Sequence, residues 1–183
     1  MHEQAIATAR SLATQRSLES RADFRIVDAD KQLPFSDASF EAVACIDAIN
    51  HLPERPRVLT DWARLLKPGG RLLFTDPTVV TGPLTNAEVA VRTSSGFYLF
   101  VPRDYDERMI AQCGLQVVVC EDRTRNVAEI AERRAKARES RSSALRQVES
   151  DAAYENQQRF LSVAAQLARE GRLSRYVYVA KKT

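Results

Sequence analysis

Residues 26–77 read IVDADKQLPFSDASFEAVACIDAINHLPERPRVLTDWARLLKPGGRLLFTDP. Within this stretch, residues 40–46 and 71–75 are nearly continuous runs of apolar side chains, as expected of strands that are covered on both faces. Residues 54–66 lie between these two runs and place apolar side chains at helical spacing. Residues 67–70 (KPGG) end that helix, because proline cannot continue it and glycine permits a turn with positive φ. A strand, a helix and a second strand in this order predict an α/β domain with a mainly parallel sheet.

The pattern of helices and strands continues on both sides of this stretch. The expected elements are a helix at 3–18, a strand at 24–27, a helix at 104–113, a strand at 115–120, one or two long helices within 126–169 and a last strand at 173–181. Residues 78–102 contain glycines and prolines around an apolar patch, so we expect a loop or a short helical excursion over a pocket. Residues 125–171 are expected to form a lid-like helical insertion before the last strand. We expect all of these elements to belong to one domain, residues 1–183.

Composition narrows the class of protein. The apolar and charged fractions, 44% and 28% of 183 residues, are those of an ordinary globular protein. The net charge of +3 is too small to predict a nucleic-acid partner, and no apolar run approaches the roughly 20 residues of a membrane span. Cys45, Cys113 and Cys120 share no short metal-ligand spacing. They are therefore interpreted as buried thiols, and we expect a cytoplasmic protein without a metal site.

Four motifs within residues 26–77 occur in a fixed order. They are Asp28-Ala29-Asp30, then Leu33-Pro34-Phe35 followed by Asp37-x-Ser39-Phe40, then Asp47-x-x-x-His51, and finally Leu66-Lys67-Pro68-Gly69-Gly70-Arg71. Together they resemble the middle of a class I S-adenosylmethionine (SAM)-dependent methyltransferase of the small-molecule type. The resemblance implies a Rossmann-like, three-layer α/β/α sheet with the strand order three, two, one, four, five, seven, six. It also implies SAM as the cofactor and a small organic molecule as the methyl acceptor.

The acidic turn is the expected site for the adenine of SAM. In the family, an acidic residue at this turn pairs with the exocyclic amine of adenine, and Asp28 matches it, with Ala29 and Asp30 lining the same turn. His2 lies in the helix that in the family begins just after the ribose-binding residue, and it is also expected at the cofactor. The alternative is that these aspartates only end a strand and begin a loop.

A second group of candidates follows the strand expected at 40–46. Open α/β sheets bind their ligands at the carboxyl ends of parallel strands. The resemblance implies that Asp47 and Ala48 contact the methionine part of SAM and that Asn50 faces the substrate. His51 is the candidate catalytic base, because an unperturbed imidazole titrates near neutral pH. The alternative for His51 is a helix cap or a packed loop histidine.

Three further residues are substrate candidates. Asp76 ends the next strand at the same edge, and its alternative is a strand-end turn. Tyr98 and Tyr105 are placed to cover an organic substrate, and core packing is the alternative for both.

One family feature is absent from the sequence. The glycine-rich loop after the first strand of the family has no counterpart, and the sequence starts about where the second strand should end. We therefore expect an N-terminally truncated sheet and a chain that by itself binds SAM weakly or not at all. We expect the chain to be a fragment of a longer protein. The alternatives are that the two flanking strands close directly on each other or that the exposed sheet edges pair with a second copy. The alternative function is a catalytically dead methyltransferase remnant that serves as an oligomerising or binding module. A nicotinamide-dependent enzyme is a further alternative, for which the dinucleotide fingerprint is absent.

Overall fold

The computed structural model describes residues 3–183. The chain divides into two compact units, Met1–Pro34 and Phe35–Thr183. In the first unit, helix α1 (Glu3–Gln15) is shorter than the helix expected at 3–18. It ends there because Ser17 adopts a left-handed conformation, with φ of 53°. Residues 22–28 follow without regular secondary structure.

The prediction of a strand at 24–27 is wrong. A strand exists where its backbone groups pair with a neighbouring strand, and no described segment pairs with these residues in a sheet. The carbonyl of Phe24 instead accepts a hydrogen bond from the Arg10 side chain at 2.9 Å.

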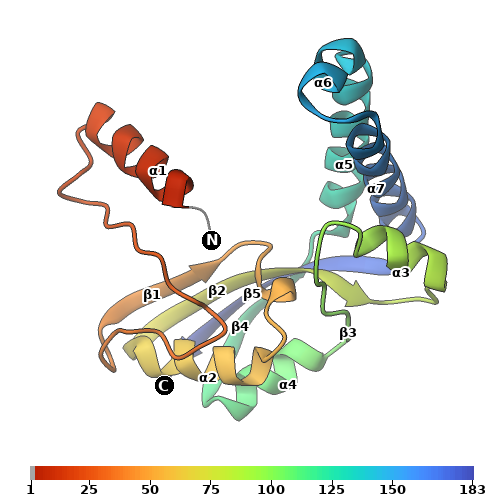
Figure 1. The fold of residues 1–183 in the computed structure, drawn as a ribbon. Helices are drawn as coiled ribbons and strands as arrows, with labels where there is room; N and C mark the ends of the chain where they lie inside the picture. The colour runs from red at the N-terminus through yellow and green to blue at the C-terminus, as the bar shows by residue number, and fades with distance from the viewer. Residues whose placement is uncertain (1–2) are drawn as a thin grey trace. The chain divides into compact units, whose positions relative to one another are not determined.

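The second unit is built on a mixed sheet. Its strands are β1 (Phe40–Cys45), β2 (Leu66–Val80), β3 (Val101–Pro102), β4 (Leu115–Asp122) and β5 (Leu173–Lys182). The strand order is β1-β2-β5-β4, and β3 pairs with the end of β2 (Figure 1). β1 runs parallel to β2, whereas β5 is antiparallel to both of its neighbours. This is the order four, five, seven, six implied by the family resemblance, so that part of the topology is confirmed.

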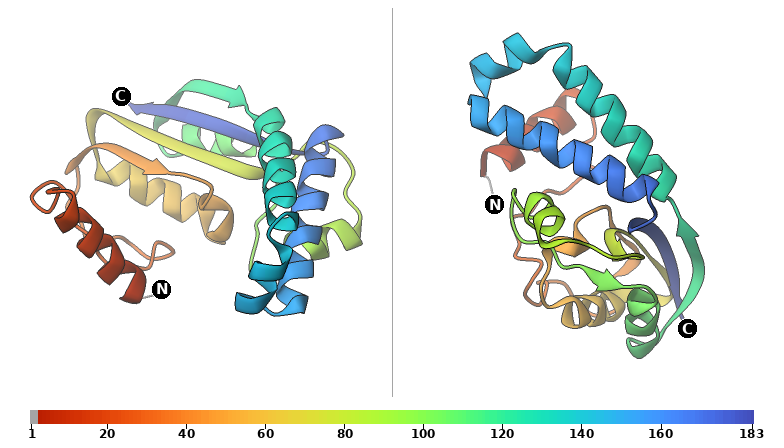
Figure 2. Two further views of the ribbon diagram at one scale, coloured as in Figure 1. Left: turned by 90° about the horizontal axis from the view of Figure 1, so that it is seen from above. Right: turned by 90° about the vertical axis from the view of Figure 1, so that its right-hand side faces the viewer.

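Helices connect these strands. They are the 3-10 helix η1 (Ile49–His51) and the α-helices α2 (Arg55–Leu65), α3 (Asn86–Arg92), α4 (Tyr105–Gln112), α5 (Thr124–Glu139), α6 (Ser142–Val148) and α7 (Asp151–Arg169). Figure 1 shows α2 and α4 on the same face of the sheet, so the second unit supplies two layers of a Rossmann-like arrangement. α5, α6 and α7 form a helical arm that precedes β5 in the chain. α5 and α7 lie side by side along this arm (Figure 2), and Ala131, Leu161, Ala164 and Ala165 pack between them.

The first residues of β2 include two adjacent glycines. Gly69 has a φ of +76°, a conformation that other residues adopt only with strain. A Cβ on Gly70 would lie 2.8 Å from the carbonyl oxygen of Lys67 and 3.1 Å from that of Glu41. α2 ends at Leu65, just before residues 67–70, and Gly69 has the positive φ that the sequence predicted, but the helix stops at an extended Leu66 and both glycines already belong to β2. The close approach at Gly70 brings β2 against β1.

A buried charge cluster joins α2, β2 and α4. Arg55 Nη1 donates to Asp76 Oδ2 at 2.5 Å and to Asp106 Oδ1 at 2.9 Å. All three side chains are buried. Asp76 Oδ1 accepts two further hydrogen bonds, from the backbone N–H and the hydroxyl of Thr78. The cluster therefore ties the end of β2 to the helical layer.

Candidate functional site

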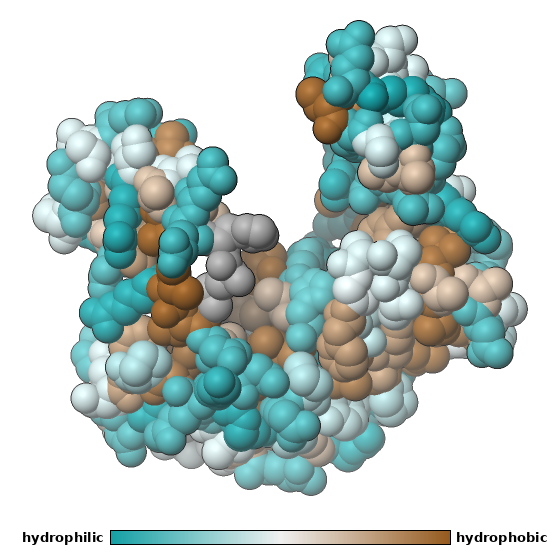
Figure 3. Space-filling view, viewed as in Figure 1, coloured by the Kyte–Doolittle hydropathy of each residue, from teal (hydrophilic) through white to brown (hydrophobic). Residues whose placement is uncertain are grey.

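A cavity of about 270 Å³ lies at the edge of the sheet where β1 ends. The lining residues are Asp47, Asn50, His51, Pro77, Arg92, Tyr98, Val127, Ile130, Ala131, Arg134, Phe160, Leu161, Ala164 and Arg175. Parallel strands β1 and β2 end at this edge, and antiparallel β5 begins there. α5 and α7 supply the facing wall. In Figure 3 the surface of the helical arm is mainly hydrophilic, whereas neutral and hydrophobic colours gather around α3.

Asp47 is held by contacts from β2 and β5. Its carboxylate accepts hydrogen bonds from Arg175, Nε to Oδ1 at 2.8 Å and Nη2 to Oδ2 at 3.1 Å. The Thr75 hydroxyl donates to Asp47 Oδ1 at 2.7 Å and accepts the Asp47 backbone N–H at 2.8 Å. Asp47 has a φ of 48°, which aspartate tolerates better than most residues. These contacts fix the direction in which the chain leaves β1.

His51 and Asn50 form the floor beside this turn. His51 Nδ1 lies 2.8 Å from the carbonyl oxygen of Phe97. A carbonyl can only accept, so Nδ1 carries the proton, and Nε2 of neutral His51 carries the lone pair that accepts the hydrogen bond from Asn50 Nδ2. Asn50 Nδ2 lies 3.4 Å from Nε2. Asn50 is fully buried, and its Oδ1 has no hydrogen-bond partner within residues 3–183.

Arg92 enters the cavity from the last turn of α3. Its guanidinium carbon lies 4.3 Å from the ring centroid of Phe160 and 5.8 Å from that of Tyr98. The Tyr98 ring also contacts the His51 ring edge to face, with 4.5 Å between centroids. Burial lowers the pKa of Arg92. The Tyr98 ring therefore lies between the guanidinium of Arg92 and the imidazole of His51 in the cavity wall.

The structure brings together four of the residues predicted from the sequence. Asp47, Asn50, His51 and Tyr98 all line the cavity. Ala48 precedes η1 as its N-cap and is exposed, but it is not among the lining residues.

Two substrate candidates lie elsewhere. Asp76 is fully buried in the cluster with Arg55, which leaves no carboxylate oxygen for a ligand. Tyr105 packs with its ring 5.9 Å from the guanidinium carbon of Arg55 and does not line the cavity. The sequence placed Asp76 at the end of a strand but could not show that its carboxylate binds Arg55.

The acidic turn belongs to the first unit. Asp28 Oδ1 accepts the backbone N–H of Asp30 at 3.0 Å, and Lys31 lies 3.6 Å from Asp28 Oδ2. Ala29 lies in the same turn. This local geometry is an Asx turn, as the loop alternative anticipated. The remaining cofactor candidate, His2, lies outside the described residues.

Sequence reasoning missed three charged residues of the cavity, Arg92, Arg134 and Arg175. Arg175 lies in β5, where the alternating pattern of the strand gave no signal of its own for this residue. Arg92 follows an apolar helical pattern and gave no separate signal.

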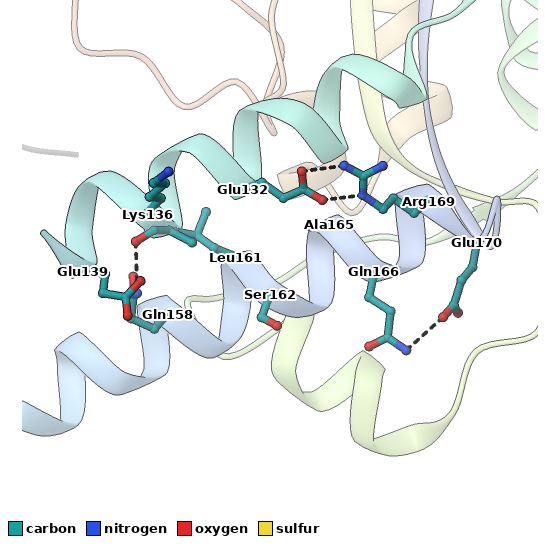
Figure 4. Close-up of a pocket in the computed structure, with 11 residues that line it drawn as sticks. Glu132, Lys136, Glu139, Gln158, Leu161, Ser162, Ala165, Gln166, Arg169 and Glu170 are labelled. Atoms are coloured by element: carbon teal, nitrogen blue, oxygen red, sulfur yellow. Dashed lines mark hydrogen bonds and ion pairs between the residues drawn. The ribbon is translucent and has the colours of Figure 1, made fainter.

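A second hollow, of about 660 Å³, lies between α5 and α7. Figure 4 shows Glu132 of α5 paired with Arg169 of α7 across this hollow. Gln166 donates to Glu170 at 3.1 Å in the same hollow. Because these polar groups already have partners, we assign no ligand to it.

Comparison with known proteins agrees with the resemblance to methyltransferases that the motifs of residues 26–77 carry. Residues 1–74 match the family described as "Methyltransferase domain". The chain is 40% identical over 83 residues to Methyltransferase GfsG of Streptomyces halstedii. The matched region covers 45% of this chain and 29% of that protein. It is 31% identical over 123 residues to 27-O-demethylrifamycin SV methyltransferase of Amycolatopsis mediterranei. This match covers 66% of this chain and 45% of that protein.

Solved structures show the same fold. A putative sarcosine dimethylglycine methyltransferase from Galdieria sulphuraria superposes with a TM-score of 0.87 at 19% identity, over all of this chain and 67% of the other. The resemblance to class I SAM-dependent methyltransferases is therefore confirmed, and with it the Rossmann-like fold.

The chain spans less than half the length of the two curated relatives. Within residues 3–183, no helix is both long and apolar enough to cross a bilayer.

Proposed function

We propose that this protein transfers a methyl group from SAM to a small organic molecule bound in the cavity at the end of β1. The observation that carries the proposal is the meeting of Asp47, Asn50 and His51 in one cavity at the strand ends. Open α/β sheets bind ligands at this edge. The name of the Amycolatopsis relative states a small-molecule methylation, which supports the same class of acceptor.

Asn50 has a side-chain oxygen that is available to bind the cofactor. SAM supplies a methyl group on a positively charged sulfur. The buried Asn50 Oδ1 lacks a donor among the described residues, and an unpaired buried carbonyl is costly. We propose that it accepts an N–H from the amino group of SAM, beside the turn that Asp47 and Ala48 form. Asp28, Ala29, Asp30 and His2 stay our candidates for the adenosine part.

His51 is proposed to move the proton. With Nδ1 bonded to the Phe97 carbonyl, Nε2 is the atom that accepts a proton from the acceptor's O–H or N–H. The rest of the rate enhancement comes from alignment of donor and acceptor, which the cavity walls enforce.

We further propose that the two units form one methyltransferase domain, residues 1–183. The family match over residues 1–74 runs through the boundary between the units, which supports this organisation. Within it, residues 125–171 act as a lid and residues 78–102 cover the cavity, since both segments contribute lining residues.

A homo-oligomer and a cytoplasmic location complete the proposal. In the described part of the chain β1 pairs only with β2, and its outer edge is the expected contact between copies. Cys45, Cys113 and Cys120 are free thiols, which supports a reducing compartment.

Calorimetric titration with SAM tests the proposed function. It is run on this chain and on a form extended upstream where the gene encodes further residues. Binding by either form, followed by mass-spectrometric detection of a methylated acceptor, supports the proposal. Absence of binding by both forms overturns it and favours the binding-module alternative.

Variants of Asn50 locate the site. Asn50→Leu removes the buried amide with little change of volume and is expected to weaken SAM binding about tenfold or more. Asn156→Leu, at an exposed position of α7, is the matched control and is expected to bind as the parent does. Equal binding by both variants would place the cofactor elsewhere.

A further inference from the structure

We propose that Arg92 binds an anionic group of the acceptor molecule, a carboxylate or a phosphate. The proposal rests on the proposed function in taking the cavity at the end of β1 as the acceptor site. It adds the chemical class of the acceptor, a small organic anion.

The first observation is that Arg92 is buried without a counter-charge. Its side chain is 5% exposed, yet within residues 3–183 no carboxylate forms an ion pair with it and its Nε has no hydrogen-bond acceptor. The other buried arginine, Arg55, is bound by both Asp76 and Asp106. A buried charge is costly unless it is paired. A ligand anion would supply the missing partner.

The second observation is how the side chain is held. Phe160 and Tyr98 lie against the guanidinium, at 4.3 and 5.8 Å from ring centroid to Cζ. Aromatic rings stabilise a cation without neutralising it or accepting its in-plane hydrogen bonds. A guanidinium fixed in this way retains its planar set of donors, which matches the two oxygens of a carboxylate or phosphate.

The charge balance of the cavity points the same way. Arg92, Arg134 and Arg175 line it, against the single carboxylate of Asp47. Arg175 already bonds both oxygens of that carboxylate. The remaining field is positive, so it favours an anion and disfavours a cationic acceptor.

The position of Tyr98 connects this anion site to the proposed base. Its ring contacts both His51 and the guanidinium of Arg92. When the anionic end of an acceptor binds Arg92, the other end of the molecule can therefore reach along the Tyr98 ring to His51. The cavity volume of about 270 Å³ limits the acceptor to a small molecule.

The test is an NMR titration of the isotopically labelled chain without SAM. The probes are inorganic phosphate, acetate and the neutral analogue acetamide, and the signal is the Nε–H resonance of Arg92, assigned from its loss in Arg92→Lys. We expect phosphate or acetate to shift this resonance in a saturable manner and acetamide to leave it unchanged. The arm with the tighter binding distinguishes a phosphorylated acceptor from a carboxylic acid.

Two variants make the result specific. Arg92→Met is expected to weaken anion binding about tenfold or more, measured from the other shifted resonances of the cavity. Arg133→Met removes the same charge at an exposed position outside the cavity and is expected to bind as the parent does. Urea unfolding of Arg92→Lys and Arg92→Met checks that both fold.

Several outcomes would overturn the inference. They are the absence of a saturable shift, an equal effect of acetamide, and equal binding by Arg92→Met. Because SAM is absent from this titration, failure of SAM binding leaves the result standing. Methyl transfer that is insensitive to Arg92→Met would overturn the inference while preserving the proposed function.

Discussion

Arg175 bonds both carboxylate oxygens of Asp47, at 2.8 and 3.1 Å, although 128 residues separate the two in the chain. Asp47 leaves the end of β1, and Arg175 is the third residue of β5. The antiparallel return of β5 along β2 brings them to the same edge of the sheet. The pair fixes the turn that carries Asn50 and His51 into the cavity.

Removal of this pair should cost modest stability. Arg175→Met is expected to lower the free energy of unfolding by about 1 kcal/mol, because the pair has good two-point geometry but is partly exposed. A double-mutant cycle with Asp47→Asn, measured by urea unfolding, isolates the coupling energy. The more exposed pair of Arg169 and Glu132 serves as control. A coupling energy no larger than that of the control would contradict the expectation.

Replacement of His51 should slow the methylation only of acceptors that lose a proton in the reaction. With an acceptor whose attacking atom is O–H or N–H, His51→Gln is expected to lower kcat about 100-fold, the lower range of general base catalysis. With a thioether, whose sulfur carries no proton before methylation, kcat should be unchanged. Steady-state kinetics with the two acceptors provide the comparison. An equal loss with both would show that His51 positions the acceptor rather than accepting its proton.

Removal of Arg55 should be far more damaging than removal of an exposed arginine. Arg55→Met leaves the carboxylates of Asp76 and Asp106 buried and unpaired, which is expected to cost about 3–5 kcal/mol. Arg108→Met, on the exposed side of α4, should change the free energy of unfolding by less than about 0.5 kcal/mol. Urea unfolding measures both. Similar costs would mean that the cluster contributes little to the fold.

The same cluster should make stability depend on pH. Burial raises the pKa of Asp106 from 3.8 to about 7, because one guanidinium cannot compensate two buried carboxylates. The folded chain thus retains a proton that the unfolded chain loses at lower pH. The resulting contribution to stability is complete below about pH 4 and is lost as the pH rises through about 7.

Asp106→Asn should remove this dependence. The variant keeps the shape of the side chain and cannot titrate, so its unfolding midpoint should fall less than that of the parent between pH 4 and 7. Thermal unfolding at a series of pH values measures the difference. Glu107→Gln, its neighbour on α4, gives a control charge change. Parallel curves for the parent and Asp106→Asn would contradict the shifted pKa.

Local sequence was sufficient for most elements. Apolar runs predicted β1 and the start of β2, and helical spacing predicted α2, because side-chain periodicity reports directly which faces are buried. The strand at 24–27 failed for the opposite reason, since a strand also needs a neighbour that its own residues do not specify.

The candidate site also has features that the sequence predicted and features that only the tertiary structure shows. By itself, the sequence determined that Asp47, Asn50 and His51 follow a strand and therefore stand at its carboxyl end, but it predicted a strand covered on both faces, whereas the residues of β1 are half-buried or exposed. Only the tertiary structure decided that Arg175 binds Asp47 and that Asp76 turns to Arg55. It also placed Arg92 against the rings of Phe160 and Tyr98, with no carboxylate of residues 3–183 as a partner. The physical reason is that the pairing of charges depends on strand register and helix packing between distant segments, which local periodicity does not encode.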